Sequence, residues 1–229
     1  MTYGLEVIPI KKKEMDQMET MQRKILKQLQ GLSNQVANTA VYTLIGAVPI
    51  RMVIDRNMLS LLMNIIKNNN SLEFQIPERQ VVMKSEQSNI FINRVEEALT
   101  KYGMEPVENL MKHPKSKEKW KRIVRYHQNK YWHEICLEDQ SNKKKLSYLQ
   151  IQENPPFMPH NIWQSTGNNP TNVKTGEIKN RLVTQTYMLQ TVRSRHNKNI
   201  SPICIPYETS TIHRARKPHT TVLLRHAYQ

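Results

Sequence analysis

The stretch SKEKWKRIVRYHQNKYWHEICL, residues 116–137, does most to decide the fold of this 229-residue chain. Ser116 directly precedes an apolar run, and serine commonly caps a helix N-terminus by accepting a backbone hydrogen bond. The pattern predicts a helix from about Lys117 to Leu137, the longest in the chain. Its apolar side chains recur every three or four residues, which is the spacing of one helix face: Trp120, Ile123, Val124, Tyr131 and Ile135.

The same spacing elsewhere in the chain predicts a mainly α protein. Six glycines and an aromatic content of 7% also argue against a turn-rich all-β fold. The predicted helices outside residues 116–137 cover 9–30, 33–42, 50–66, 77–83, 88–101 and 173–191. In the first of them the apolar face consists of three methionines, an isoleucine and a leucine: Met15, Met18, Met21, Ile25 and Leu29.

Composition divides the chain into four regions. Residues 1–111 are predicted to be helical, and residues 112–153 to be a basic helical region. Residues 154–172 read as a linker rich in proline and asparagine, because four of the twelve prolines fall there. Residues 173–229 follow as a basic helix and a tail. Beyond Ser201 the apolar period is lost, so we expect a poorly structured basic C-terminal tail.

Positive charge dominates the second half of the chain. The formal net charge is +15 and the sequence pI is about 9.8. Residues 111–150 carry 11 basic and four acidic side chains, and residues 151–229 carry 10 and three. Uncompensated charge of this kind favours an anionic partner, with nucleic acid first and an acidic membrane surface second.

Several classes of protein are excluded by what the sequence lacks. Two cysteines, Cys136 and Cys204, are too few for a disulfide-rich secreted domain. The N-terminal residues lack the basic and apolar regions of a signal peptide. No apolar run approaches the ~20 residues that span a bilayer. We therefore expect an intracellular protein, in the nucleus or the cytoplasm, with no membrane partner.

Catalytic motifs are also missing from the sequence. The only aspartates, Asp16, Asp55 and Asp139, are far apart along the chain, so no polymerase-type pair of aspartates is available to hold two Mg²⁺ ions. The phosphate-binding G-x-x-x-x-G-K-[ST] loop, the G-x-S-x-G elbow and the G-x-G-x-x-G turn do not occur. We therefore do not expect an enzyme.

Two clusters of basic residues are the candidate nucleic-acid-binding sites. Cations along one helix face suit phosphates, and interleaved aromatic rings suit single-stranded bases. The alternative is a solvated basic helix whose aromatic side chains, Trp120 and Tyr131 first, belong to the core. The first cluster is Lys115, Lys117, Lys119, Lys121, Arg122 and Arg125. The second is Arg193, Arg195 and Lys198.

Metal ligation has two candidate places. His133 and Cys136 are three residues apart on the predicted helix and His127 lies six residues before His133, but a buried thiol and hydrogen-bonded imidazoles explain them better. In the tail, Cys204 begins a C-x-x-C-like spacing in which Tyr207 occupies the second position. Histidines follow it, the last being His226. Two firm ligands do not make a closed zinc site.

Six segments, in order over about residues 3–204, resemble the region just after the polymerase core of animal non-LTR retrotransposon reverse transcriptases. They are Tyr3–Val7, Gln22–Leu32, Asn38–Ile50, Arg79–Lys84, Pro114–Lys121 and Ile178–Gln190.

The resemblance implies a thumb-like multi-helix bundle followed by a nucleic-acid-binding region. It implies that the fingers and palm, with the catalytic aspartates, would lie before Met1 and are absent from this chain. The family's C-terminal region ends in a zinc module, in which Cys204 would be the first ligand and His226 would stand in the place of the last. Because Tyr207 replaces the second ligand, we expect no cofactor, with zinc at a degenerate site as the alternative.

Together these patterns predict a non-catalytic, nucleic-acid-binding remnant of a reverse transcriptase that contacts RNA or DNA phosphates through basic helices. The alternative is a protein-interaction module, or a residual fragment of the polyprotein with no independent activity. The resemblance implies that the partner of helix 9–30 is missing. We therefore expect its methionine face to be exposed, with marginal folding of residues 1–32 or self-association through residues 9–30.

Overall fold

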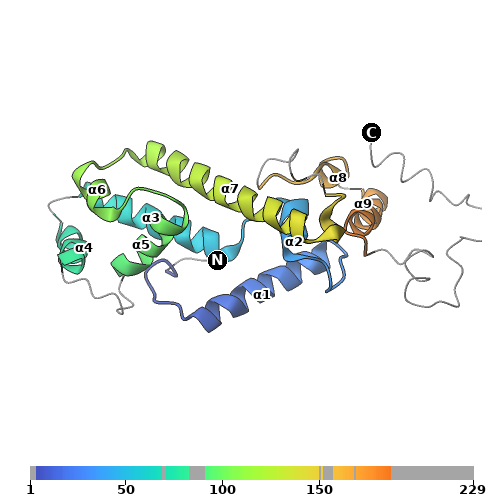
Figure 1. The fold of residues 1–229 in the computed structure, drawn as a ribbon, viewed down its shortest axis with the longest axis horizontal. Coiled ribbons are helices and arrows are strands. Elements are labelled where there is room, and N and C mark those ends of the chain that lie inside the picture. The colour runs from blue at the N-terminus through green and yellow to red at the C-terminus, as the bar shows by residue number, and fades with distance from the viewer. Residues whose placement is uncertain are drawn as a thin grey trace, which may run out of the picture.

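A computed structural model of the chain describes residues 4–68, 71–82, 91–149, 151, 157–167 and 169–186 (Figure 1). Within these ranges the protein is helical and contains no strand, so the predicted mainly α fold is confirmed. The elements are α1 (Lys12–Leu29), α2 (Asn38–Ile45), α3 (Ile50–Lys67), α4 (Leu72–Val82), α5 (Phe91–Lys101), α6 (Val107–Lys112), α7 (Lys117–Asn142), η1 (Lys144–Leu146), α8 (Asn161–Gln164) and α9 (Pro170–Val183).

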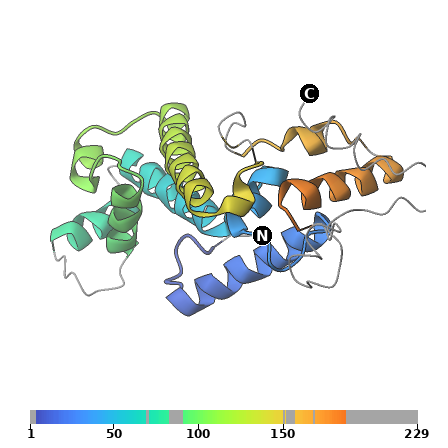
Figure 2. The same cartoon turned by 45° about the vertical axis from the view of Figure 1, so that its right-hand side comes forward.

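The long helix α7 lies antiparallel to α3 and is the main support of the molecule (Figures 1 and 2). Ser116 is its N-cap, as predicted, and its hydroxyl accepts a hydrogen bond from the backbone N–H of Lys119 at 3.4 Å. Trp120 is buried against α3 and donates its indole N–H to the carbonyl of Leu59 at 2.9 Å. The helix runs five residues past the predicted end at Leu137.

Two apolar cores lie along α7. The first joins α3, α5 and α6 to the N-terminal half of α7, and Leu59, Leu62 and Val95 are fully buried in it. The second gathers α2 and the residues after α7, including Leu44 and Leu149, around Cys136. The predicted regions 1–111 and 112–153 therefore share both cores.

The described part of the predicted linker, residues 157–167 and 169–172, lies against the body of the protein. The backbone N–H of His160 donates to the carbonyl of Leu44 at 3.0 Å, and α8 follows directly. Gly46 makes this approach possible, because a Cβ there would lie 2.4 Å from the carbonyl carbon of Met158. Gly46 also adopts φ +69°, a left-handed conformation that suits glycine at a helix C-terminus.

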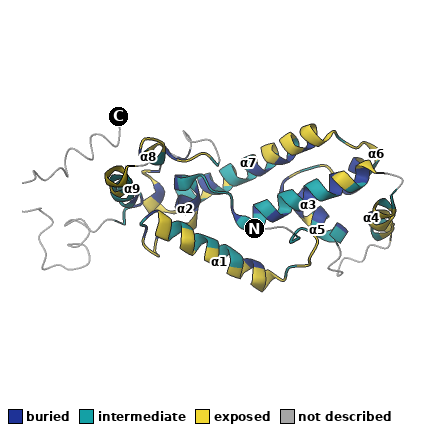
Figure 3. Ribbon diagram, turned by 180° about the vertical axis from the view of Figure 1, so that it is seen from behind, coloured by how far each residue is buried: buried dark blue, intermediate teal, exposed yellow. Residues whose placement is uncertain are grey.

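Helix α1 leaves most of its apolar stripe exposed, as expected, and packs largely through polar side chains. Met15 is buried, but Met21, Ile25 and Leu29 are 65%, 44% and 62% exposed. Figure 3 shows exposed residues along this helix. The inward side instead carries Gln22, whose side chain satisfies several backbone and side-chain groups of the α2–α3 turn region.

These contacts explain the orientation of α1. The amide of Gln22 donates to the carbonyl of Val48 at 2.9 Å, and its oxygen accepts from the backbone N–H of Ile50 at 2.8 Å. Arg51 at the start of α3 pairs with Glu19 at 2.8 Å and with Asp16 at 3.1 Å. Helix α1 is therefore fixed by hydrogen bonds and ion pairs, together with the buried Met15 and with Leu26, which packs against the second core. The expectation of an exposed methionine face holds for its central and C-terminal turns.

Candidate nucleic-acid interface

The inner face of α7 holds the helix in a fixed position. Trp120, Val124 and Gln128 are buried at four-residue spacing, so they form one continuous contact with α3. The side-chain amide of Gln128 donates to the carbonyl of Met52 at 2.9 Å. Side chains on the opposite face therefore project from a rigid support.

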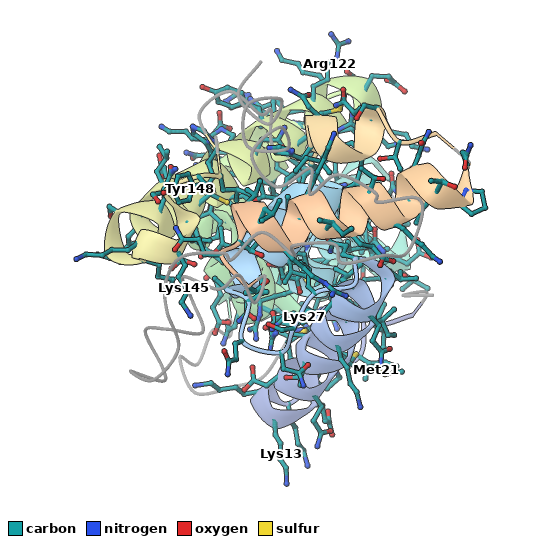
Figure 4. The ribbon with its side chains drawn as sticks, turned by 90° about the vertical axis from the view of Figure 1, so that its right-hand side faces the viewer. Lys13, Met21, Lys27, Arg122, Lys145 and Tyr148 are labelled. Atoms are coloured by element: carbon teal, nitrogen blue, oxygen red, sulfur yellow. The ribbon has the colours of Figure 1, made fainter. Side chains whose placement is uncertain are left out.

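The outer face of the same turns is basic and open to solvent. Glu118 is the single acidic residue among the first turns of the helix. Arg122 projects away from the body, on the side opposite to Met21 of α1 (Figure 4). The exposed cations of these turns make no ion pair with any carboxylate in the described part of the chain: Lys117, Lys119, Lys121, Arg122 and Arg125.

Lys115 differs from the other members of the first predicted cluster. It precedes α7, its side chain is half-buried, and its ammonium lies 3.4 Å from the carboxylate of Glu105. The cluster is therefore five free cations on α7 together with one lysine that is partly neutralised.

Aromatic side chains contribute less to this surface than their number in the sequence suggests. Trp120 is in the core, as expected, and Tyr131 packs edge-to-face on Tyr102 with ring centroids 5.2 Å apart. Trp132 is half-buried and packs on Tyr42 at 5.6 Å. Tyr126 is different, because it is 65% exposed on the basic face. It is the one ring of the α7 aromatic group in a position to stack on a base.

The helical repeat separates the cations of α7 into two rows. Lys119, Arg122 and Lys130 share the outermost side of the helix with Tyr126. Residues four apart, Lys117, Lys121 and Arg125, instead follow the edge that faces α3. The second row, Lys117, Lys121 and Arg125, can therefore contact an anion together with residues of α3.

Arg56 of α3 is the functional candidate that sequence reasoning missed. Its Nε donates to the side-chain oxygen of Gln128 at 2.9 Å, so its half-buried guanidinium lies beside α7. Burial, and then repulsion by Arg125, lower the pKa of Arg56. No sequence signal identifies this residue, since it is a single arginine on an apolar helix far along the chain from Arg125.

The carboxylate that precedes Arg56 on α3 is already paired. Asp55 accepts hydrogen bonds from the ammonium of Lys101 at 3.0 Å and from the hydroxyl of Tyr102 at 2.6 Å. Burial and the neighbouring Asp55 carboxylate raise the pKa of Tyr102, which stays protonated. Asp55 therefore offers little neutralisation to the cations on α7.

The second predicted cluster, Arg193, Arg195 and Lys198, lies outside the described residues, as do the tail cysteine Cys204 and His226. In the part of α9 that precedes them, Arg181 donates to the carbonyl of Gly31 at 2.6 Å and has a structural role. The binding roles of the second cluster and a zinc site at the tail remain predictions.

His127 and Cys136 of α7 have other partners. Cys136 is buried beside the hydroxyl of Thr43 at 3.8 Å, and burial raises the pKa of its thiol to about 12. A ring nitrogen of His127 lies 3.0 Å from the carbonyl of Tyr102. In residues 4–186, apart from the gaps given above, no three His, Cys, Asp or Glu side chains are grouped as metal ligands.

No helix among the described residues has the length and apolar character needed to cross a bilayer. Comparisons with models of protein families, with curated proteins and with solved structures find no match to this chain.

Proposed function

We propose that this protein binds RNA or DNA through backbone phosphates, using the exposed basic face of α7, and that it is a non-catalytic derivative of a non-LTR retrotransposon reverse transcriptase. The observation that carries the binding proposal is a rigid helix with five exposed cations and no carboxylate partner for them in the described part of the chain. The derivation from a reverse transcriptase rests on the order of the resembling segments.

The chemistry of these side chains favours phosphates over base edges. Lysine and arginine on an exposed helix face bind phosphate oxygens regardless of sequence, whereas specific reading needs groups that enter a groove and meet base edges. Tyr126 beside Arg122 adds a stacking surface that suits a single strand. We therefore expect little sequence selectivity and tighter binding to single strands than to duplexes.

The salt dependence of the affinity tests this proposal. If the five free cations of α7 each contact one phosphate of a single strand, raising the salt from about 50 to 200 mM should weaken binding about a hundredfold. The measurement is fluorescence anisotropy with a short labelled single-stranded RNA and with DNA of the same sequence. An affinity that ignores salt, or an absence of binding at the lowest salt, would contradict the proposal.

A second candidate function rests on α1. Met21, Ile25 and Leu29 follow one another at four-residue spacing and form an exposed apolar stripe. An apolar helix face of this kind can pair with the same face of a second copy. The stripe is short, so a weak and concentration-dependent dimer is the expected form.

Sedimentation velocity over a range of protein concentrations tests this self-association. We expect the sedimentation coefficient to rise with concentration for the native protein and to become constant when Met21→Gln and Ile25→Gln remove apolar surface from the stripe. Lys24→Gln, at an exposed position between them, is the control and should leave the association unchanged. A native protein with no concentration dependence would eliminate this candidate.

A further inference from the structure

We propose that Arg56 and Arg125 hold a single phosphate group between them at the seam of α3 and α7, which makes this pair the anchoring site for a nucleic-acid backbone. The inference rests on the proposed function and gives it a specific place. It assigns the strongest contact to a residue of α3 rather than to the outermost lysines of α7.

The first argument is the way in which Arg56 is held. Its Nε donates to Gln128 at 2.9 Å, and Gln128 is completely buried and bound in turn to the carbonyl of Met52. One nitrogen of the guanidinium is therefore used for positioning, and within the described ranges no hydrogen bond or ion pair engages the two terminal nitrogens. A guanidinium fixed in this way loses little conformational freedom when it binds an oxyanion.

The second argument is the charge around Arg56. The half-buried guanidinium has no carboxylate within ion-pair distance in the described part of the chain. Arg125, three residues before Gln128 on α7, is close enough to destabilise the charge of Arg56, and the pKa of Arg56 is lowered by burial and by this repulsion. Arginine stays protonated, so the two guanidinium groups continue to repel each other. An anion that lies between the two side chains would relieve this repulsion.

A phosphate has the geometry that this arrangement needs. Its oxygens accept paired hydrogen bonds from planar guanidinium groups, and two arginines can approach one phosphate from different sides. Lys121 and Lys117 continue from Arg125 along the same edge of α7 at four-residue intervals. A backbone anchored at the pair can therefore follow the α3–α7 seam toward the N-terminus of α7.

A double-mutant cycle tests whether the two arginines share one phosphate. Arg56→Gln and Arg125→Gln are each expected to weaken binding of a short labelled single-stranded RNA about tenfold. The double variant should lose little more than either single variant, because the second substitution acts on a phosphate contact that is already lost. The slope of log affinity against log salt should fall by about 0.7, the value for one phosphate of a single strand, in all three.

Arg125 and Lys119 form the control pair, since they lie on different rows of α7. Arg125→Gln combined with Lys119→Gln should multiply the two single losses and reduce the salt slope for a single strand by about 1.4. Thermal unfolding monitors the fold. If Arg56→Gln lowers the unfolding temperature, Arg56→Lys replaces it in the cycle, because lysine can still donate to Gln128 but lacks the planar fork.

The outcomes separate this inference from the function on which it rests. If the native protein binds RNA and the affinity losses of the Arg56 and Arg125 variants multiply, as in the control pair, the shared site is overturned and the proposed function is not. If substitution of Arg56 leaves the affinity unchanged, the shared site is overturned as well. A native protein that binds neither RNA nor DNA at low salt overturns the proposed function and the anchoring site together.

Discussion

Replacing Lys119, Arg122 and Arg125 with glutamate should reduce nucleic-acid affinity about a thousandfold at low salt. Three phosphate contacts are lost, and each new carboxylate repels the backbone that the native side chain attracts. The three positions are exposed and have no carboxylate partner in the described part of the chain, so the fold should be retained. Anisotropy with labelled RNA, next to circular dichroism for helix content, measures both effects.

The matched control places the same change of charge on another helix. Lys12, Lys13 and Lys24 are exposed on α1, and their replacement by glutamate alters the net charge by the same amount. We expect this control to change affinity only several-fold, through the general field of the protein. An equal loss in both variants would mean that net charge, rather than a face of α7, governs binding.

Replacing Trp120 with alanine should lower the free energy of unfolding by about 3–5 kcal/mol. The indole fills the contact between α7 and α3, and a large cavity in a core costs more than the lost transfer free energy alone. The hydrogen bond to the carbonyl of Leu59 is lost as well. Urea denaturation followed by circular dichroism gives the value directly.

Tyr126→Ala provides the comparison on the same helix. This ring is 65% exposed, so its removal should change the free energy of unfolding by no more than about 0.5 kcal/mol. A Trp120→Ala cost below about 1 kcal/mol would show that α7 is not supported by this contact. The basic face would then lack the rigid base that the binding proposal requires.

Local signals in the sequence predicted the long helices well but placed the shorter ones less accurately, since α2 begins at Asn38 rather than 33, α4 begins at Leu72 rather than 77, and α9 ends at Val183 rather than 191. The Ser116 cap and the spacing of Trp120 and Val124 depend only on neighbours within two turns, and they place α7 and its buried side correctly. The predicted end at Leu137 was five residues too early. The following residues are polar, and the helix continues there because Cys136 and the residues after α7 pack together in the second core.

The polar contacts that hold α1 could not be predicted in the same way, and its exposed methionine face was expected only from the resemblance. A stripe of Met21, Ile25 and Leu29 normally marks the buried face of a helix, and hydrophobic periodicity cannot show whether a partner surface exists. The side of α1 that faces the protein carries Gln22, whose hydrogen-bond partners are Tyr42, Val48 and Ile50. These groups come together only after α2 and α3 have folded.

The candidate site was predicted in part for a related reason. The cations of α7 are close together in the sequence, so the order of residues alone predicts that they cluster on one helix. Arg56 lies on another helix, and its place beside Arg125 depends on the antiparallel packing of α3 against α7. Pairing across helices is a tertiary property that a single sequence does not reveal.

The attachment of α1 through polar side chains affects how the protein responds to temperature. Separation of α1 exposes amides and charged groups, such as Gln22 and Arg51, together with the apolar side chains of Met15 and Leu26. Because apolar hydration dominates the heat-capacity change of unfolding, release of this helix should alter the heat capacity less than the unfolding of the two cores does. Cooling weakens contacts of the apolar kind, so near freezing the polar contacts of α1 should lose less stability than the two cores.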